Sequence, residues 1–245
     1  MNESAKFLGL EFSCHDLVDI TRRLTEFEPT IGIAYHLVNA YSLVMANESP
    51  RLYSLFKKDV LICDGKPLAR ALKRGVPSLQ QIRGADLMRQ VISESTPSAR
   101  HFFLGSTDEV LRGLIAFAQR TNPDIDISGY YSPEFTENFY VALPTWLKKI
   151  RESNATIVWI GLGTPKQDYV AHDIAQQIPV HAVAIGAAFD YLSGNISEAP
   201  KLFQLLGLEW FYRLMKEPKR LAGRYLVGNL KFLRLLLVDY IIPKK

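Results

Sequence analysis

The chain has 245 residues, of which 48% are hydrophobic and 22% are charged. This composition is too apolar for a disordered chain, and it fits one large packed domain or one domain with an appendage. Two cysteines, Cys14 and Cys63, are too few for a disulfide framework or a four-cysteine zinc site, which favours a reducing compartment.

The net charge of +4 is unevenly distributed. Residues 201–245 hold ten Lys and Arg against three acids, so this tail carries +7 and the first 200 residues carry −3. The N-terminal segment lacks the basic start and apolar core of a secretory signal. No run reaches the roughly 18 apolar residues of a membrane-spanning helix. We therefore expect a cytoplasmic protein, with contact to a membrane surface left open.

Short apolar runs alternate with amphipathic stretches through the first 200 residues. The runs predict buried strands at Phe7–Phe12, Gly32–Val38, Val60–Cys63, His101–Leu104, Ile125–Gly129, Ala155–Leu162 and Val180–Ile185. Helical spacing predicts helices at Leu17–Phe27, Asp108–Arg120 and Gln167–Gln177. This alternation predicts an α/β fold with a doubly wound, mostly parallel, Rossmann-like sheet.

From about Pro200 the pattern changes to two or three helices without a strand, with breaks at Gly207 and Pro218. We expect residues 1–199 to form an α/β domain and residues 200–245 to form a basic, amphipathic helical appendage.

The segment TIVWIGLGTPKQDYV carries the most informative turn. A predicted strand leads into Gly161 and Gly163, Thr164 is suited to cap the next helix, and Pro165 is suited to start it. Backbone N–H groups at such a helix start suit a phosphate, and Gln167 can turn its amide into the crevice at the carboxyl ends of the strands. An ordinary strand-to-helix turn explains the same glycines equally well.

Two further glycine turns follow predicted strands. In HFFLGSTDEV, Gly105 makes the turn and Ser106 or Thr107 caps the helix. In VAIGAAFDYLSG, Phe189 is suited to stack on a base and Asp190 to accept hydrogen bonds from a ribose or sugar. A core aromatic and a helix cap are the alternative. Together the three turns favour a nucleotide-like ligand.

A carboxylate ends another predicted strand. Asp64 directly precedes Gly65, where it is suited to act as a general base or a metal ligand, with helix capping as the alternative. Downstream, Arg83 in QQIRGADLM is suited to bind a phosphate or a sugar hydroxyl, or simply to pair with Asp86. Asn39, at the end of the second strand, is a polar candidate for the same crevice.

Several other kinds of site lack support. The five histidines form neither HExxH nor a Cys/His cluster, so we expect no metal and no cofactor. His36 and His101 are interpreted as core or surface histidines. The serine-hydrolase pattern G-x-S-x-G and the phosphate-loop pattern GxxxxGK[ST] are absent.

Taken together, CDGKPL, RGADL, IGLGTPKQDY, IGAAFDYLSG with Ala199–Pro200, and GLEWFYRLMKEPKR resemble the WecG/TagA/CpsF family of bacterial glycosyltransferases over nearly the whole chain. The resemblance implies transfer of a sugar from a UDP-sugar to a polyprenyl-pyrophosphate-linked acceptor at the cytoplasmic membrane face. It implies inversion at the sugar and no metal in the catalytic step. The products would be exopolysaccharide, teichoic acid linkage units or common antigen.

Carried over by motif, Asp64 matches the general base. The resemblance and the glycine turns together assign the donor sugar-nucleotide to Asn39, Arg83, Gly105, Gly163, Gln167, Phe189 and Asp190. The C-terminal helices match an appendage that docks on an anionic membrane and supplies arginines to the acceptor pyrophosphate. Here those arginines would be Arg213, Arg220 and Arg224.

Two departures from the family pattern leave the donor sugar open. Leu37 stands where the family often has Thr, and Glu198 stands where it often has a basic residue. N-acetylmannosamine, its uronic acid and glucose all remain candidates, and the oligomeric state, a homo-oligomer included, is open as well. The rival functions are another nucleotide-dependent α/β enzyme, such as a dehydrogenase, and a non-catalytic protein that docks on membranes through its tail. No nucleic-acid partner is expected, because no RNA-binding motif is present.

Overall fold

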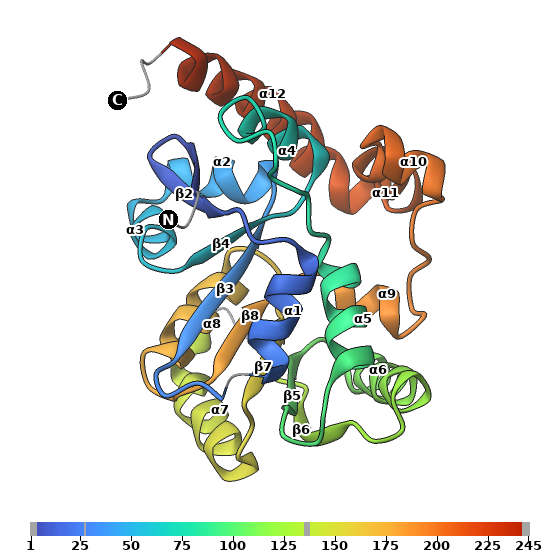
Figure 1. Cartoon of the computed structure of the whole chain (residues 1–245). Helices are drawn as coiled ribbons and strands as arrows, with labels where there is room; N and C mark the ends of the chain where they lie inside the picture. Colours follow the sequence, from blue (N-terminus) through green and yellow to red (C-terminus); the bar gives the residue numbers. More distant parts are fainter. Residues whose placement is uncertain (1–3, 27, 135–137, 242–245) are drawn as a thin grey trace.

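The computed structural model of the chain describes residues 4–26, 28–134 and 138–241. Its centre is an eight-stranded sheet in the order β1-β2-β4-β3-β8-β7-β5-β6 (Figure 1). The strands are β1 (Ser4–Phe7), β2 (Leu10–Ser13), β3 (Ile33–Val38), β4 (Val60–Cys63), β5 (Arg100–Gly105), β6 (Asp126–Tyr131), β7 (Ile157–Gly161) and β8 (His181–Ala184). Only β1 and β2 pair antiparallel, and the other neighbours are parallel. The predicted doubly wound, mostly parallel sheet is thus confirmed.

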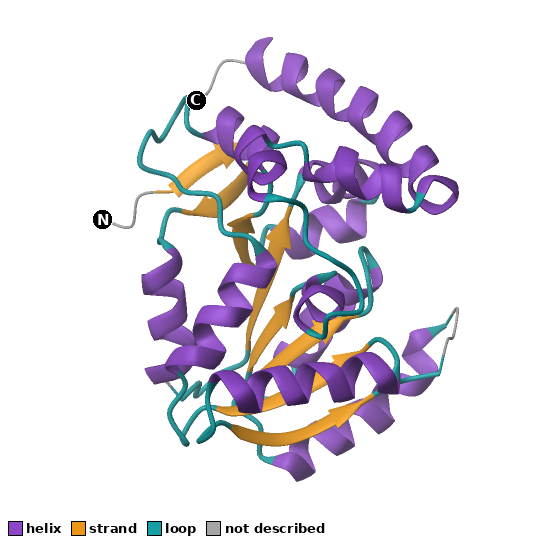
Figure 2. Ribbon diagram, turned by 90° about the vertical axis from the view of Figure 1, so that its right-hand side faces the viewer, coloured by secondary structure: helices purple, strands orange, loops and turns teal. Residues whose placement is uncertain are grey.

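Helices cover both faces of the sheet (Figure 2). One face packs against α1 (Leu17–Glu26), α5 (Gly84–Glu94), α6 (Asp108–Thr121) and α9 (Ala188–Leu192). The other packs against α2 (Ala40–Glu48), α3 (Pro50–Phe56), α4 (Lys66–Leu72), α7 (Phe139–Ser153) and α8 (Lys166–Ala175). Because side chains alternate along a strand, Leu37 and Val38 of β3 belong to the cores on opposite faces.

Helix α6 illustrates why the amphipathic stretches fold as predicted. The Thr107 hydroxyl accepts a hydrogen bond from the backbone N–H of Val110 (3.3 Å), which caps the helix start. Val110, Leu111 and Leu114, at helical spacing, are buried against the sheet. The predicted helix Asp108–Arg120 ends one residue later, at Thr121.

The predicted single strand Phe7–Phe12 is wrong, because a turn divides it into the hairpin of β1 and β2. Leu8 and Gly9 have φ angles of 50° and 74°, a conformation that reverses the chain. The Tyr53 hydroxyl donates a hydrogen bond to the Leu8 carbonyl (2.8 Å) and would lie 2.9 Å from a Cβ at Gly9. Glycine is therefore needed there on two counts.

After Pro200 the described chain holds only helices, α10 (Lys201–Leu206), α11 (Glu209–Lys216) and α12 (Pro218–Ile241), as predicted. Gly207 ends α10 in the left-handed conformation, and Pro218 starts α12. Figure 1 places the three helices together across one end of the molecule, with α12 along α2. None of the helices in the described ranges combines the length and apolar character needed to cross a bilayer.

The sheet has a switch point beside β8. Helix α8, which follows β7, and helix α9, which follows β8, pack on opposite faces although the two strands are neighbours. Such a divergence opens a crevice at the carboxyl ends of the strands, which is where ligands bind in open α/β sheets.

Candidate active site

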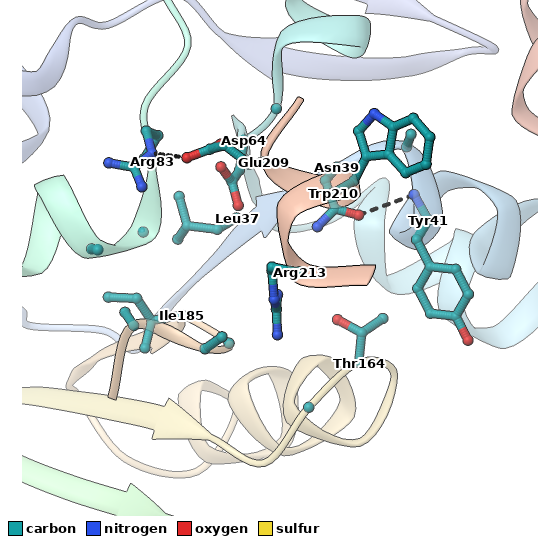
Figure 3. Close-up of a pocket in the computed structure, with 18 of the residues that line it drawn as sticks. Leu37, Asn39, Tyr41, Asp64, Arg83, Thr164, Ile185, Glu209, Trp210 and Arg213 are labelled. Carbon is teal, nitrogen blue, oxygen red and sulfur yellow. Dashed lines mark hydrogen bonds and ion pairs between the residues drawn. The ribbon is translucent and has the colours of Figure 1, made fainter. Parts of the chain in front are cut away.

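A pocket of about 420 Å³ lies at the carboxyl ends of β3, β4, β7 and β8. The loops after these strands and the start of α5 line it from the body, while α11 and α12 line it from the appendage. Figure 3 shows Arg213 of α11 reaching into the space between Leu37, Asn39 and Thr164. The predicted crevice therefore exists, and the C-terminal helices form part of its wall.

Asn39 and Asp64 stand side by side at the ends of adjacent strands. Val38 and Cys63 are paired in the sheet, and the backbone N–H of Asp64 donates to the Val38 carbonyl (2.8 Å). The Asn39 side-chain oxygen caps α2 by accepting from the backbone N–H of Tyr41 (3.0 Å). Asp64 caps nothing, since Gly65 holds the N-cap position of α4, so its carboxylate remains available to a ligand.

Asp64 is partly buried, and its surroundings keep its carboxyl neutral to an unusually high pH. Loss of water contact raises the pKa first, and the carboxylates of Glu209 and Asp86 raise it further. Arg83 and Arg213 lower it, and the outcome is a pKa raised to about 7. Because a general base works best when its pKa lies near the working pH, Asp64 is better suited to this role than an ordinary aspartate.

Arg83 is surrounded by three carboxylates. Its Nε lies 2.8 Å from Glu209, its Nη1 lies 3.1 Å from both oxygens of Asp86, and its Nη2 lies 3.0 Å from Glu198. The predicted pairing with Asp86 is confirmed, and two further partners add to it. Glu198, the departure from the family pattern, also pairs with Arg89. Arg83 thus joins α5, the segment before α10, and α11.

Arg213 differs from Arg83 in having an unused donor. Its Nε is buried and has no hydrogen-bond partner among the described residues, and its guanidinium lies 5.7 Å from the centre of the Tyr191 ring. A buried donor without a partner costs free energy, which an anionic group bound in the pocket would recover.

The turn after β7 is open toward the pocket. Gly163 has φ +77°, and nothing lies within 4 Å of where its Cβ would be. Its backbone N–H donates to the Gln167 side-chain oxygen (3.0 Å), so Gln167 stabilises the turn from within. Helix α8 starts at Lys166, one residue before the predicted range Gln167–Gln177, and Pro165 holds its N-cap position, so the predicted cap by Thr164 is wrong. This helix start, facing the pocket, suits a phosphate group.

Comparison with known protein families bears on this site. The model of the glycosyl transferase WecG/TagA/CpsF family matches residues 5–245. The chain belongs to this family. The match spans the α/β body and the C-terminal helices alike, and it confirms the resemblance drawn from the sequence motifs. The protein is accordingly a glycosyltransferase, and its pocket is the candidate place for donor and acceptor to meet.

Most of the predicted site residues meet in this pocket of the WecG/TagA/CpsF fold. Those that line it are Asn39, Asp64, Arg83, Gly163, Gln167, Asp190 and Arg213. Asp190 accepts a hydrogen bond from the Asn195 side chain (3.0 Å). The side chains of Arg220 and Arg224 lie outside the described part of the structure, so their contact with an acceptor stays a prediction.

Phe189 and Gly105 do not line the pocket, which corrects their assignment to the donor site. Phe189 is 1% exposed and packs edge-on against Phe103, so it is the core aromatic of the alternative interpretation. A Cβ on Gly161 would lie 2.7 Å from the Phe189 ring, and one on Gly105 would lie 2.5 Å from the Gly161 carbonyl. These glycines permit close packing behind the pocket.

Among the pocket residues that sequence reasoning missed are Glu209 and Trp210, both at the start of α11. For Glu209 the only local signal was an acid in a strongly basic tail, which does not indicate a distant partner. Their contribution depends on how the appendage folds back over the sheet.

Two buried histidines have structural partners. Both His36 and His101 are fully buried, which confirms their interpretation as core histidines. Nδ1 of His101 accepts from the Trp159 indole (2.9 Å), and burial lowers its pKa to about 3, so this ring is neutral. Within the described residues, no group of three or more His, Cys, Asp or Glu is arranged to hold a metal ion.

Proposed function

We propose that the protein is an inverting transferase that moves a hexosyl or N-acetylhexosaminyl group from a UDP-sugar to a polyprenyl-pyrophosphate-linked sugar. This places it in the synthesis of a cell-surface polysaccharide: an exopolysaccharide, a teichoic acid linkage unit or a common antigen. The observation that carries the proposal is a single pocket holding both Asp64, with a pKa near 7, and the unpartnered Nε of Arg213.

In the proposed reaction, the acceptor hydroxyl oxygen attacks the anomeric carbon from the face opposite UDP. The bond from that carbon to the β-phosphate oxygen breaks, UDP leaves with the bonding electrons, and Asp64 takes the hydroxyl proton. One displacement inverts the anomeric centre. A positioned base of this kind contributes about 10²- to 10⁴-fold to the rate.

The leaving UDP needs positive charge as its bond breaks. The open turn at Gly163 exposes the N-terminus of α8, and the positive end of this helix dipole favours the donor diphosphate without reorganisation. Arg213 supplies a further positive charge, which we assign to the acceptor pyrophosphate together with Arg220 and Arg224. This arrangement supports the proposal that the catalytic step uses protein groups and no metal.

The donor sugar would lie next to an apolar part of the pocket. Leu37 and Ile185 both line it, and Leu37 is in the position where the family often has Thr. Since an apolar side chain forms no hydrogen bond, the donor sugar at this point contacts the protein through carbon atoms or bound water. The donors to compare first are the three sugars that the family resemblance leaves open: N-acetylmannosamine, its uronic acid and glucose.

We further propose that residues 200–245 dock the enzyme as a peripheral protein on the cytoplasmic face of an anionic membrane. Helices α10 and α12 expose large apolar side chains, among which Leu205 and Leu230 are 68% and 70% exposed. The same segment carries +7. Apolar side chains next to basic ones bind the surface of an anionic bilayer, where each Lys or Arg adds about 1 kcal/mol. The appendage would thus hold the pocket next to a lipid-linked acceptor.

The test is a transfer assay with a panel of UDP-sugars and a short-chain polyprenyl-pyrophosphoryl sugar, run with and without a chelator. We expect one UDP-sugar to yield a product heavier by one sugar residue, with inverted anomeric configuration by NMR and no loss in the chelator. Retained configuration, or a requirement for metal, would contradict the proposed mechanism. Failure of every UDP-sugar would contradict the proposed donor class.

A further inference from the structure

We propose that Glu209 of the appendage helix α11 is a positioning residue for Asp64, the base of the proposed reaction. Glu209 binds Arg83 and faces Asp64. Packing of α11 against the body therefore completes the site that accepts the proton. This inference rests on the proposed function, in which Asp64 takes the proton. It assigns a specific chemical task to the contact between appendage and body.

The contact is direct and lies at the pocket wall. Nε of Arg83 lies 2.8 Å from Oε1 of Glu209, and both residues line the same pocket as Asp64 (Figure 3). Asp86 and Glu198 occupy the remaining guanidinium nitrogens. Glu209 is therefore the one partner of Arg83 that comes from the described part of the appendage, and its position depends on the seating of α11.

The charged side chains around Asp64 come from the starts of α5 and α4 and from α11. Arg83 and Asp86 belong to the start of α5, while Glu209 and Arg213 belong to α11. Lys66, at the start of α4, also lines the pocket, and its Nζ donates to the Leu205 carbonyl of α10 (2.6 Å). Seating the appendage therefore brings one negative and one positive side chain to the surroundings of Asp64.

Glu209 raises the pKa of Asp64 in two ways. Its own carboxylate disfavours a second negative charge nearby, and it is the largest charged contributor after burial itself. It also neutralises Arg83, whose positive charge would otherwise favour the ionised form of Asp64. Replacing Glu209 by glutamine removes both effects in the same direction, so the pKa of Asp64 should fall.

A matched control exists on the same interface. Glu48 of α2 pairs with Lys231 of α12, so this ion pair also joins body and appendage. Neither residue lines the pocket or contributes to the pKa of Asp64. Glu48→Gln thus removes a tie of the same chemistry while leaving the surroundings of Asp64 unchanged.

The experiment is a carboxyl ¹³C NMR titration of the full chain labelled at aspartate, with the Asp64 signal assigned by its absence in Asp64→Asn. We expect the midpoint of Asp64 to fall by about one pH unit in Glu209→Gln, since a nearby charge shifts a pKa by one to three units. It should stay unchanged in Glu48→Gln. An unchanged midpoint in Glu209→Gln, or an equal shift in the control, would overturn the inference.

Two additions keep the outcome interpretable. Glu209→Asp withdraws the carboxylate by one methylene, so it should lower the midpoint by less than Glu209→Gln and serves as the test if the glutamine variant does not fold. The titration needs no turnover, so it stands whether or not Asp64 is the base. If the midpoint shifts but the acidic limb of kcat/KM does not follow it, then the proposed role of Asp64 fails while Glu209 keeps its effect on the carboxyl.

Discussion

Nδ1 of His36 lies 3.0 Å from Oδ1 of Asp168, and this contact ties β3 to the first turn of α8. The other ring nitrogen lies 3.1 Å from Asp59, which also contacts Nδ1 of His172 (2.8 Å). Burial by itself lowers the pKa of His36, but the hydrogen bonds and charges of Asp168 and Asp59 outweigh it and raise the pKa. With a carboxylate at each nitrogen, the imidazolium form of the ring is favoured.

This buried cluster should make stability depend on pH. Because the folded pKa of His36 is raised, its contribution is fully present below the unfolded value of about 6.5 and is lost as pH rises through the folded value. His36→Gln leaves the buried Asp168 carboxylate without its charged partner, while Asp59 keeps His172, so we expect a loss of about 3–5 kcal/mol at pH 6 and a smaller loss at pH 9. Urea unfolding at both pH values measures this. His15→Gln, at a partly exposed histidine, is the control, and an equal loss at the two pH values would contradict an imidazolium in the core.

Asp64→Asn should remove the proposed base without emptying the pocket. We expect turnover to fall by about 10²- to 10⁴-fold while the Kd of UDP stays within about twofold, because the carboxamide keeps the shape of the side chain. In the wild type, kcat/KM should decline below about pH 7, where Asp64 becomes protonated. Single-turnover kinetics and calorimetry provide the measurements. Near-normal turnover in the variant would remove Asp64 from this role.

The same substitution should stabilise the fold at neutral and higher pH. An aspartate with a folded pKa of about 7 and an unfolded one near 3.8 binds its proton more tightly when folded, so its ionisation costs stability as pH rises between these values. Asn has no such cost. We expect Asp64→Asn to raise Tm at pH 8, where each kcal/mol is worth roughly 2–4 °C for a chain of this size, and to raise it by less at pH 5. A pH-independent change in Tm by calorimetry would contradict the raised pKa.

The sequence predicted the parts of the structure that depend on local pattern. The strand Val60–Cys63 has the predicted bounds, and the breaks at Gly207 and Pro218 separate the C-terminal helices as expected. The strand Phe7–Phe12 was wrong because an apolar run conceals a turn when Gly9 is its only marker. Local signals thus identify elements more securely than they identify a hairpin inside one hydrophobic stretch.

The site residues that could be predicted are likewise those that depend on local sequence pattern. Asp64 and Asn39 could be predicted because strand ends in a parallel sheet share one edge. Phe189 could not be separated from a core aromatic, since the position after a strand does not fix which way a ring points. Glu209 was missed because its partner Arg83 is far away in the sequence, and only the packing of α11 joins them.

Arg213 has a buried Nε without a hydrogen-bond partner among the described residues, and its substitution should weaken binding of the lipid-linked acceptor. A hydrogen bond from a charged group is worth about 1.5–3 kcal/mol, so Arg213→Gln should reduce kcat/KM for the acceptor by roughly 10- to 150-fold. Lys216→Gln, which removes an exposed charge from the same helix, should have little effect. Steady-state kinetics at varied donor and acceptor distinguish the two diphosphates. A rise in the donor KM alone would move Arg213 to the UDP side.

The proposed membrane contact can be tested without disturbing the fold. Leu230 and Leu233 of α12 are 70% and 56% exposed, so replacing both by glutamate costs little packing and adds charge that an anionic bilayer repels. We expect sedimentation with anionic liposomes to fall at least tenfold, along with activity on a long-chain acceptor in liposomes. Activity on a short-chain acceptor in solution should be retained, because these side chains do not line the pocket.

The matched control for this test is Val141→Glu. Val141 is 77% exposed on α7, which Figure 1 places at the end of the molecule opposite α12. It adds one glutamate, against two in the Leu230/Leu233 variant, at a comparably exposed apolar position, so liposome binding should stay at the wild-type level. Wild-type binding should also weaken as salt is raised, since part of it comes from the basic residues of the appendage. If the Leu230/Leu233 variant sedimented as well as the wild type, α12 would not be the docking surface.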